Sequence, residues 1–257
     1  ADIGGTFTDL VLLDKGGRLH VQKTPSTPDD FKNGILNGVQ ITLETANETR
    51  TADQQLALKD IEYFVHGATV VLNALLQRKL PRTALVTTAG FRDVLEIMRT
   101  NNPFMYDMKY IKPPALIPRR LRFEVVERVL HTGAVMTALD EASVREIAGR
   151  LRESGAEAVA VCLIHAYANP THEQRVAEII REVCPGIVVC VSSDVAGEQR
   201  EFERTSTTSI NAATVPIITS YLDRLTTELR DRGLKKDLYV MQSNGGVITS
   251  RVARDLP

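Results

Sequence analysis

The sequence predicts an α/β fold in which helices cover both faces of a sheet. Residues 158–163 and 187–191 form continuous apolar runs of strand length, and a segment with apolar residues at helical spacing precedes each of them. A strand that is apolar on both sides must be buried on both sides, so this alternation indicates a sheet between two layers of helices.

The first expected elements are a hairpin and a helix. Residues 10–13 and 19–22 are strand-like, and the connection between them contains Gly16 and Gly17, which suit a tight turn. Residues 27–30 predict a helix start, with a hydroxyl cap, an early proline and two acidic residues near the positive end of the helix. The apolar stripe of this helix comprises Phe31, Ile35, Leu36 and Val39.

Strand and helix signals then alternate along the chain. The expected strands cover 61–65, 84–87, 123–129, 158–163, 187–191 and 237–241, and the expected helices cover 69–76, 91–98, 140–151 and 170–183. Residues 101–121 hold four prolines and a basic cluster, so an irregular excursion is expected there. After residue 198 the pattern is helical, and Pro216 is expected to divide it into two helices, the second ending near Arg232.

Composition and charge exclude several classes of protein. Lys and Arg total 31 against 32 for Asp and Glu in 257 residues, so no basic surplus favours a nucleic-acid partner. No apolar run is long enough to cross a membrane, and no leader opens the chain, so a cytoplasmic location is expected. Cys162, Cys184 and Cys190 show no paired spacing and are expected to be buried reduced thiols, although a catalytic cysteine stays open.

The strongest chemical signal is the octet at the start of the chain, Asp2-Ile3-Gly4-Gly5-Thr6-Phe7-Thr8-Asp9. Adjacent glycines at a strand end let backbone N–H groups approach a phosphate closely. Thr6 and Thr8 alternate along the chain, so they are expected to share a face and to add hydroxyl donors. Asp2 could orient a hydrated Mg²⁺, and Asp9 is a weaker candidate for the same cluster.

This octet resembles the first phosphate motif of the superfamily that contains actin, sugar kinases and heat-shock chaperones. The residues of the octet are similar in particular to those of the hydantoinase A/5-oxoprolinase family, which includes the beta-type subunits of acetone carboxylases. Further blocks of that family resemble 66–76, 87–97, Asn102-Pro103 with Tyr106-Asp107, 120–125, 203–207 and 242–246. The resemblance therefore covers essentially the whole chain, although Ala68 stands where the family usually has a threonine.

The resemblance implies a ribonuclease-H-like fold, a mixed sheet with helices on both faces. It also implies a hydantoinase/oxoprolinase N-terminal domain over 1–196 and the start of a catalytic domain over 197–257. The chain begins without methionine and ends at Pro257, so we expect a piece of a longer protein. A second phosphate motif and the adenosine-binding segment would follow beyond that end.

The implied activity is ATP- and Mg²⁺-dependent ring opening of a cyclic amide, such as a hydantoin or 5-oxoproline, by phosphorylation of the amide oxygen. Gly4, Gly5, Thr6 and Thr8 would hold phosphate, and Asp2 would hold Mg²⁺ through water. The family also implies a B-type partner subunit or a fused equivalent. Two alternatives stay open: an ATP-dependent carboxylase of a small ketone, and a non-catalytic nucleotide-binding protein on the same fold.

Several other residues are weaker candidates. His66, Thr69 and Asn73 are expected near substrate or phosphate, the latter two sharing a helix face with His66. Arg92 or Arg99 would lie at a substrate carboxylate or in the interdomain cleft, although a solvated helix face with ion pairs explains both residues equally simply. For Glu203-Arg204-Thr205 a cleft role and plain helix surface both stay open. His165 and His172 are interpreted as structural, and no residue is identified as a general base.

Overall fold

The computed structural model describes residues 1–27, 31–99, 104, 106–242 and 244–254, without the side chains of Phe31 and Ala68. Residues 28–30 of the expected helix start, the Asn102-Pro103 pair and Ser243 lie outside this set, whereas Thr27 Oγ1 accepts from the N–H of Gly34 over 3.0 Å. The chain divides into two compact units. The first comprises residues 1–79 and 217–257, and the second comprises residues 80–216.

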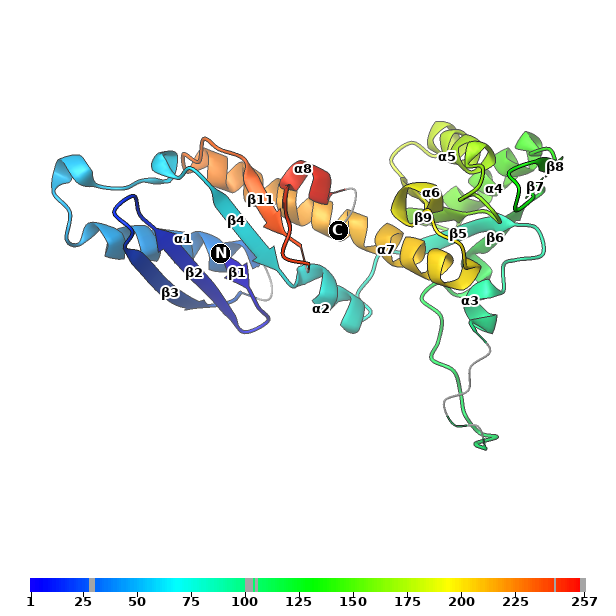
Figure 1. Ribbon diagram of the computed structural model, residues 1–257, viewed down its shortest axis with the longest axis horizontal. Helices are drawn as coiled ribbons and strands as arrows, with labels where there is room; N and C mark the ends of the chain where they lie inside the picture. The colour runs from blue at the N-terminus through cyan, green and yellow to red at the C-terminus, as the bar shows by residue number, and fades with distance from the viewer. Residues whose placement is uncertain (28–30, 100–103, 105, 243, 255–257) are drawn as a thin grey trace. The chain divides into compact units, whose positions relative to one another are not determined.

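The first unit is built on a mixed sheet with the strand order β12-β11-β4-β1-β2-β3 (Figure 1). β1 pairs in parallel with β4 and antiparallel with β2, while β4 also pairs in parallel with β11. The bounds are β1 Asp2–Ile3, β2 Phe7–Leu13, β3 Leu19–Pro25, β4 Phe64–Ala68, β11 Leu238–Met241 and β12 Val247–Thr249.

Helices bury one side of this sheet. The first unit contains α1 (Phe31–Asn47), α2 (Val70–Leu76), α8 (Ser250–Ala253) and residues 217–231 of α7 (Glu201–Asp231), with short 3₁₀ turns at Ala52–Gln54 and Leu58–Asp60. Leu10, Ile35 and Leu225 belong to its core. The opposite face of the β2–β3 hairpin is open among the described residues, since Val11, Leu13, Leu19 and Val21 are 59 to 65% exposed.

The second unit is built on a parallel sheet with the strand order β10-β9-β5-β6. Its strands are β5 Thr83–Thr88, β6 Arg122–Val125, β9 Ala158–Cys162 and β10 Val188–Val191, beside a small antiparallel pair, β7 Arg128–Val129 and β8 Val135–Thr137. From β5 the chain continues to β6 on one side, and from β9 it continues to β10 on the other. The strand order therefore reverses between β5 and β9.

Helices lie on both faces of this second sheet, as predicted (Figure 1). The helices are α3 Val94–Ile97, α4 Glu141–Glu153, α5 Thr171–Val183, α6 Ser192–Val195 and residues 201–216 of α7, with a 3₁₀ turn at Arg119–Leu121. Asp140 caps α4 as expected, because its Oδ1 accepts from the N–H groups of Ala142 and Ser143.

Two expectations about helices were wrong. Pro216 does not divide the last helical region, since α7 runs without a break from Glu201 to Asp231. Proline removes one helical hydrogen bond, and the buried side chains of Val215 and Ile218 on either side of it offset that loss. The helix expected over 91–98 is confined to Val94–Ile97, and it ends at Met98, which has a φ of 58°.

Other sequence predictions are confirmed. All three cysteines are buried and form no disulfide bond, and burial raises the pKa of the Cys162 thiol, which does not favour a nucleophile. In the part of the chain that the structure describes, no helix has both the length and the apolar character needed to cross a membrane.

Candidate functional site

A tight turn at Gly4, Gly5 and Thr6 joins β1 to β2. The N–H of Gly4 donates to the carbonyl of Phe7 over 2.9 Å. A Cβ at residue 4 would lie only 3.2 Å from that carbonyl oxygen, so glycine fits the position best. The octet thus forms the close backbone turn that the sequence predicts.

The outer side of this turn presents unused donors. The N–H groups of Gly5 and Thr6 have no hydrogen-bond partner among the described residues, and both residues are exposed. Two neighbouring N–H groups of this kind, with a threonine hydroxyl beside them, form a small concave site for an anion. A phosphate oxygen is the ligand that such a site suits best.

Thr8 supports the turn from the inside. β2 begins at Phe7, so Thr6 lies in the turn, whereas Thr8 is fully buried. The Thr8 hydroxyl lies 3.1 Å from Ser26 Oγ, which in turn donates to the Gly4 carbonyl over 2.8 Å. The expectation that Thr6 and Thr8 share a face is therefore wrong, and Thr8 is placed to position the turn rather than to touch a ligand.

Two carboxylates lie side by side on the open face of the sheet next to the turn. Asp2 and Asp9 are directly opposite each other in the β1–β2 register, and both are exposed. Asp9 forms an ion pair with Lys23, 3.2 Å away, so Asp2 is the less neutralised of the two. A Cβ at residue 67 would lie 2.8 Å from Asp2 Oδ1, so Gly67 leaves room for this carboxylate.

These residues fit a hydrated Mg²⁺. Like charges directly opposite in a sheet repel each other, and a divalent cation would remove that repulsion. Among the described residues no group of three or more His, Cys, Asp or Glu side chains could enclose a metal. Mg²⁺ commonly binds through one or two carboxylates while keeping water and phosphate as its other ligands, which matches this pair.

Thr69 and Asn73 close one side of the turn. Thr69 Oγ1 donates to the Ile3 carbonyl over 3.0 Å, and Asn73 Nδ2 donates to Thr69 Oγ1 over 3.3 Å. A Cβ at Gly5 would lie 4.0 Å from Asn73 Nδ2, which places the amide beside the turn. The expected one-turn relationship between Thr69 and Asn73 is present.

His66 lies on the other side of the sheet. It is fully buried, with Nδ1 3.2 Å from the Ala1 carbonyl and Nε2 2.8 Å from the Tyr221 hydroxyl. Because a carbonyl only accepts, Nδ1 carries the proton, and Nε2 accepts from Tyr221. Burial lowers the pKa of His66 to about 4. This burial argues against the expected contact with substrate and supports a structural role.

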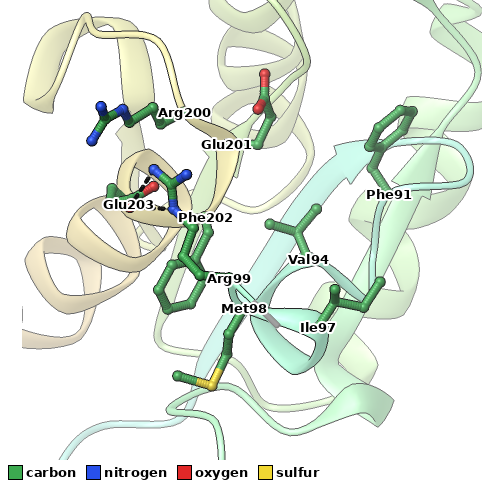
Figure 2. Close-up of a pocket in the computed structure, with 9 residues that line it drawn as sticks. All are labelled: Phe91, Val94, Ile97, Met98, Arg99, Arg200, Glu201, Phe202 and Glu203. Carbon is green, nitrogen blue, oxygen red and sulfur yellow. Dashed lines mark hydrogen bonds and ion pairs between the residues drawn. The ribbon is translucent and has the colours of Figure 1, made fainter. Parts of the chain in front are cut away.

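The two candidate arginines lie in the second unit, and each has a carboxylate partner. Arg92 Nε is 3.6 Å from Glu124 Oε2, and Arg99 Nε donates to Glu203 Oε1 over 2.6 Å. Arg99 and Glu203 line a pocket between α3 and the start of α7 (Figure 2). Sequence reasoning named both residues, but their pairing across 104 positions of sequence left no local signal.

Comparison with known proteins decides the family. The model of the family described as "Hydantoinase/oxoprolinase N-terminal region" matches residues 1–184, and the model described as "Hydantoinase/oxoprolinase" matches residues 204–257. The chain belongs to the hydantoinase/oxoprolinase family. The domain boundary predicted after residue 196 falls in the interval between the two matches and stays a prediction.

Two relatives within the family match nearly the whole chain. Caprolactamase subunit alpha of Pseudomonas jessenii is 34% identical over 258 residues, covering 99% of this chain and 36% of that protein. Acetone carboxylase beta subunit of Xanthobacter autotrophicus is 30% identical over 260 residues, covering 96% of this chain and 36% of that protein. The chain thus spans about a third of the length of these relatives, both of which are subunits of larger complexes.

Solved structures of the family share the fold. The ATP-dependent caprolactamase from Pseudomonas jessenii superposes with a TM-score of 0.86 at 33% identity, over 95% of this chain and 35% of that chain. The nucleotide-free structure of acetone carboxylase, described as an ATP-dependent carboxylation system, superposes with a TM-score of 0.84 at 29% identity, over 99% of this chain and 38% of that chain. The mixed α/β architecture is therefore shared with two ATP-dependent enzymes.

Proposed function

We propose that this chain forms the nucleotide-phosphate site of an ATP-dependent enzyme that opens a cyclic amide. The observation that supports this proposal best is the β1–β2 turn. There, two N–H groups that have no partner among the described residues lie beside an exposed threonine and the Asp2 carboxylate. The family match and the caprolactamase relative point to the same chemistry. We also propose that the first unit is ribonuclease-H-like, because its strand order places this turn at the centre of a mixed sheet.

The proposed reaction begins with transfer of the γ-phosphoryl group of ATP to the amide oxygen, which releases ADP. Water then adds to the activated carbon, and the ring C–N bond breaks with protonation of nitrogen, which leaves an acyl phosphate. A second water hydrolyses this acyl phosphate to the carboxylic acid and phosphate. The products are the ring-opened amino acid, ADP and phosphate. In such a transfer the protein mainly positions phosphate and offsets its charge, which is the role we assign to Gly4, Gly5 and Thr6.

In this scheme Asp2 would hold Mg²⁺ through water, and Asp9 would contribute more weakly because Lys23 already neutralises it. Bound with the nucleotide, Mg²⁺ would offset the charge on the phosphate oxygens. Thr69 and Asn73 would keep the turn in place from its side. Thr8 and Ser26 would do so from inside the unit.

A second candidate is an ATP-dependent carboxylase of a small ketone, which the likeness to acetone carboxylase favours. Both reactions activate an oxygen by phosphorylation, so the phosphate site suits either. Carboxylation requires bicarbonate and ring opening does not. A third candidate, a nucleotide-binding protein without turnover, predicts binding of ATP with no stimulation by any small molecule.

We further propose that the second unit binds a partner polypeptide, either a B-type subunit or a fused equivalent, through the segment of described residues 104 and 106–114, which we name the arm. Tyr106, Met108 and Ile111 are 92, 97 and 87% exposed, and side chains of this kind are enriched in protein interfaces. Lys112 Nζ anchors the arm by donating to the carbonyls of Glu96 and Ile97 at the end of α3.

Phosphate release from ATP tests the proposed reaction. The full-length protein with its partner subunit would receive hydantoin, 5-oxoproline, caprolactam or acetone, each with and without bicarbonate. Stimulation by a cyclic amide without bicarbonate is the expected result. Stimulation only by acetone with bicarbonate would move the protein to the carboxylases. ATP binding without any stimulation would contradict both reactions.

A further inference from the structure

A pocket of about 270 Å³ lies within the second unit, between α3 with the loop before it and the N-terminal turn of α7 (Figure 2). Its lining comprises Phe91, Val94, Ile97, Met98, Arg99, Arg200, Glu201, Phe202 and Glu203. The first of these residues follow the carboxyl end of β5. That strand borders the point where the order of the parallel sheet reverses, and ligands of parallel α/β sheets bind outside the carboxyl ends of the strands at such points.

Five of the nine residues that line the pocket are apolar, and the other four are charged. The apolar residues are Phe91, Val94, Ile97, Met98 and Phe202 (Figure 2). Small-molecule sites combine apolar walls with a few polar groups that fix orientation. The volume suits a ligand of about one ring with a short substituent.

The charged rim of the pocket is balanced. Arg99 and Arg200 contribute two positive charges, and Glu201 and Glu203 contribute two negative charges. Arg99 forms an ion pair with Glu203, with 2.6 Å between Arg99 Nη2 and Glu203 Oε1. Figure 2 shows this pair at one end of the pocket, while the Glu201 carboxylate lies on another side. A ligand carboxylate would therefore meet two carboxylates as well as the arginines, whereas an uncharged amide needs only one donor and one acceptor.

The backbone of the pocket is strained at two places. Four residues other than glycine have positive φ in the described chain, and two of them, Met98 at 58° and Arg200 at 80°, line this pocket. Side chains other than glycine rarely adopt this conformation, and residues held in it cluster at ligand sites. The two residues with strained backbone thus belong to the pocket lining, as expected of a ligand site.

We infer that this pocket binds an uncharged cyclic amide by its apolar ring, in preference to one that carries a carboxylate. The inference rests on the proposed function, since it names the substrate class of that reaction, and it differs from the prediction that Arg92 or Arg99 binds a substrate carboxylate. Arg92 already forms an ion pair with Glu124, and Arg99 forms one with Glu203.

A matched pair of probes tests this inference: 5-oxoproline, which carries a carboxylate, and 5-oxoprolinamide, which does not. Saturation-transfer NMR on the full-length protein without ATP would measure their dissociation constants, with caprolactam as a third, uncharged probe. The amide is expected to bind about tenfold more tightly than the acid. Phe202→Ala is expected to weaken caprolactam binding by about tenfold, because it removes the aromatic wall.

A charge change separates this pocket from any other site. Glu203→Gln removes the partner of Arg99, so the affinity for 5-oxoproline should rise about fivefold or more while that for caprolactam changes little. Glu146→Gln, an exposed change on α4, serves as the control and should alter neither value. Tighter binding of 5-oxoproline than of its amide by the unmodified protein, or no effect of Phe202→Ala, would overturn the inference.

The two proposals can fail separately. Amide binding that Phe202→Ala weakens, without amide-stimulated phosphate release, would support the pocket and contradict the reaction. Phosphate release stimulated as strongly by 5-oxoproline as by its amide, with both insensitive to Phe202→Ala, would support the reaction and contradict the pocket.

Discussion

Gly67 leaves the space into which the carboxylate of Asp2 projects. The two residues are paired in the parallel register of β1 and β4, and a Cβ at position 67 would lie 2.8 Å from Asp2 Oδ1. The nearest atom is the end of a side chain rather than backbone, so an added methyl group would move the carboxylate more readily than the strands. A glycine in β4 thus determines where a carboxylate of β1 lies.

Gly67→Ala is therefore expected to damage the site and leave the fold intact. Displacement of the Asp2 carboxylate should weaken Mg²⁺-dependent ATP binding by about tenfold, whereas the free energy of unfolding should change by less than about 1 kcal/mol. Calorimetric titration with ATP and Mg²⁺ measures the first quantity, and urea unfolding measures the second. Gly149→Ala, where an added Cβ meets nothing within 4 Å, is the matched control.

Asp2 and Asp9 should respond differently to loss of charge. Asp2→Asn is expected to raise the Mg²⁺ concentration for half-maximal phosphate release by about tenfold, because no described Lys or Arg side chain forms an ion pair with this carboxylate, which lies opposite Asp9. Asp9→Asn should have a smaller effect, since Lys23 already neutralises that carboxylate. Titration of activity with Mg²⁺ at fixed ATP compares the two variants, and equal effects would contradict the assignment of Asp2.

The buried His66 should make the first unit less stable in acid. Burial lowers its pKa from 6.5 to about 4, so between these values the unfolded chain binds a proton that the folded chain excludes. Stability is therefore fully present above pH 6.5 and falls with decreasing pH, by roughly 3 kcal/mol if no other group compensates.

Urea unfolding at several pH values checks this dependence against His66→Gln, which cannot take up the proton. The His66→Gln variant should show a flatter dependence of the unfolding free energy on pH. The control His131→Gln, at an exposed histidine, should show the same steep dependence as the unmodified protein. A histidine variant with the same slope as the unmodified protein would show that His66 is not the titrating group.

The arm should govern association with a partner subunit. Replacing Tyr106, Met108 and Ile111 together by serine removes three of the four large exposed apolar side chains that the structure describes in the arm. We expect affinity for the B-type subunit to fall by about a hundredfold or more, with ATP binding unchanged. Analytical ultracentrifugation of the two purified subunits measures this, and Met136→Ser, at another exposed methionine, is the control. Unchanged association would contradict the role of the arm.

Local patterns predicted most of the fold. The β2–β3 hairpin followed from two apolar runs around a glycine turn, and α4 followed from Asp140 and an apolar stripe. The buried strands β9 and β10 followed from runs that are apolar on both sides. Each of these signals lies within a dozen or so residues of its element, which is why a single sequence reveals it.

The surroundings of the site residues were harder to predict. The burial of His66 depends on Tyr221, which lies 155 positions away, and alternation along β4 gives no indication of which face is covered. The burial of Thr8 depends on where β2 begins and on Ser26 at the end of β3. The role of Gly67 depends on the parallel register with Asp2. Contacts between distant segments decided all three, and no local pattern encodes them.

The central claim is that the turn at Gly4, Gly5 and Thr6 holds the phosphates of ATP. A crystal structure of the full-length protein with Mg²⁺ and a non-hydrolysable ATP analogue tests it most directly. We predict phosphate oxygens about 3 Å from the backbone nitrogens of Gly5 and Thr6, with a hydrated Mg²⁺ beside Asp2. A well-ordered triphosphate bound elsewhere, with these two N–H groups facing only solvent, would contradict the account.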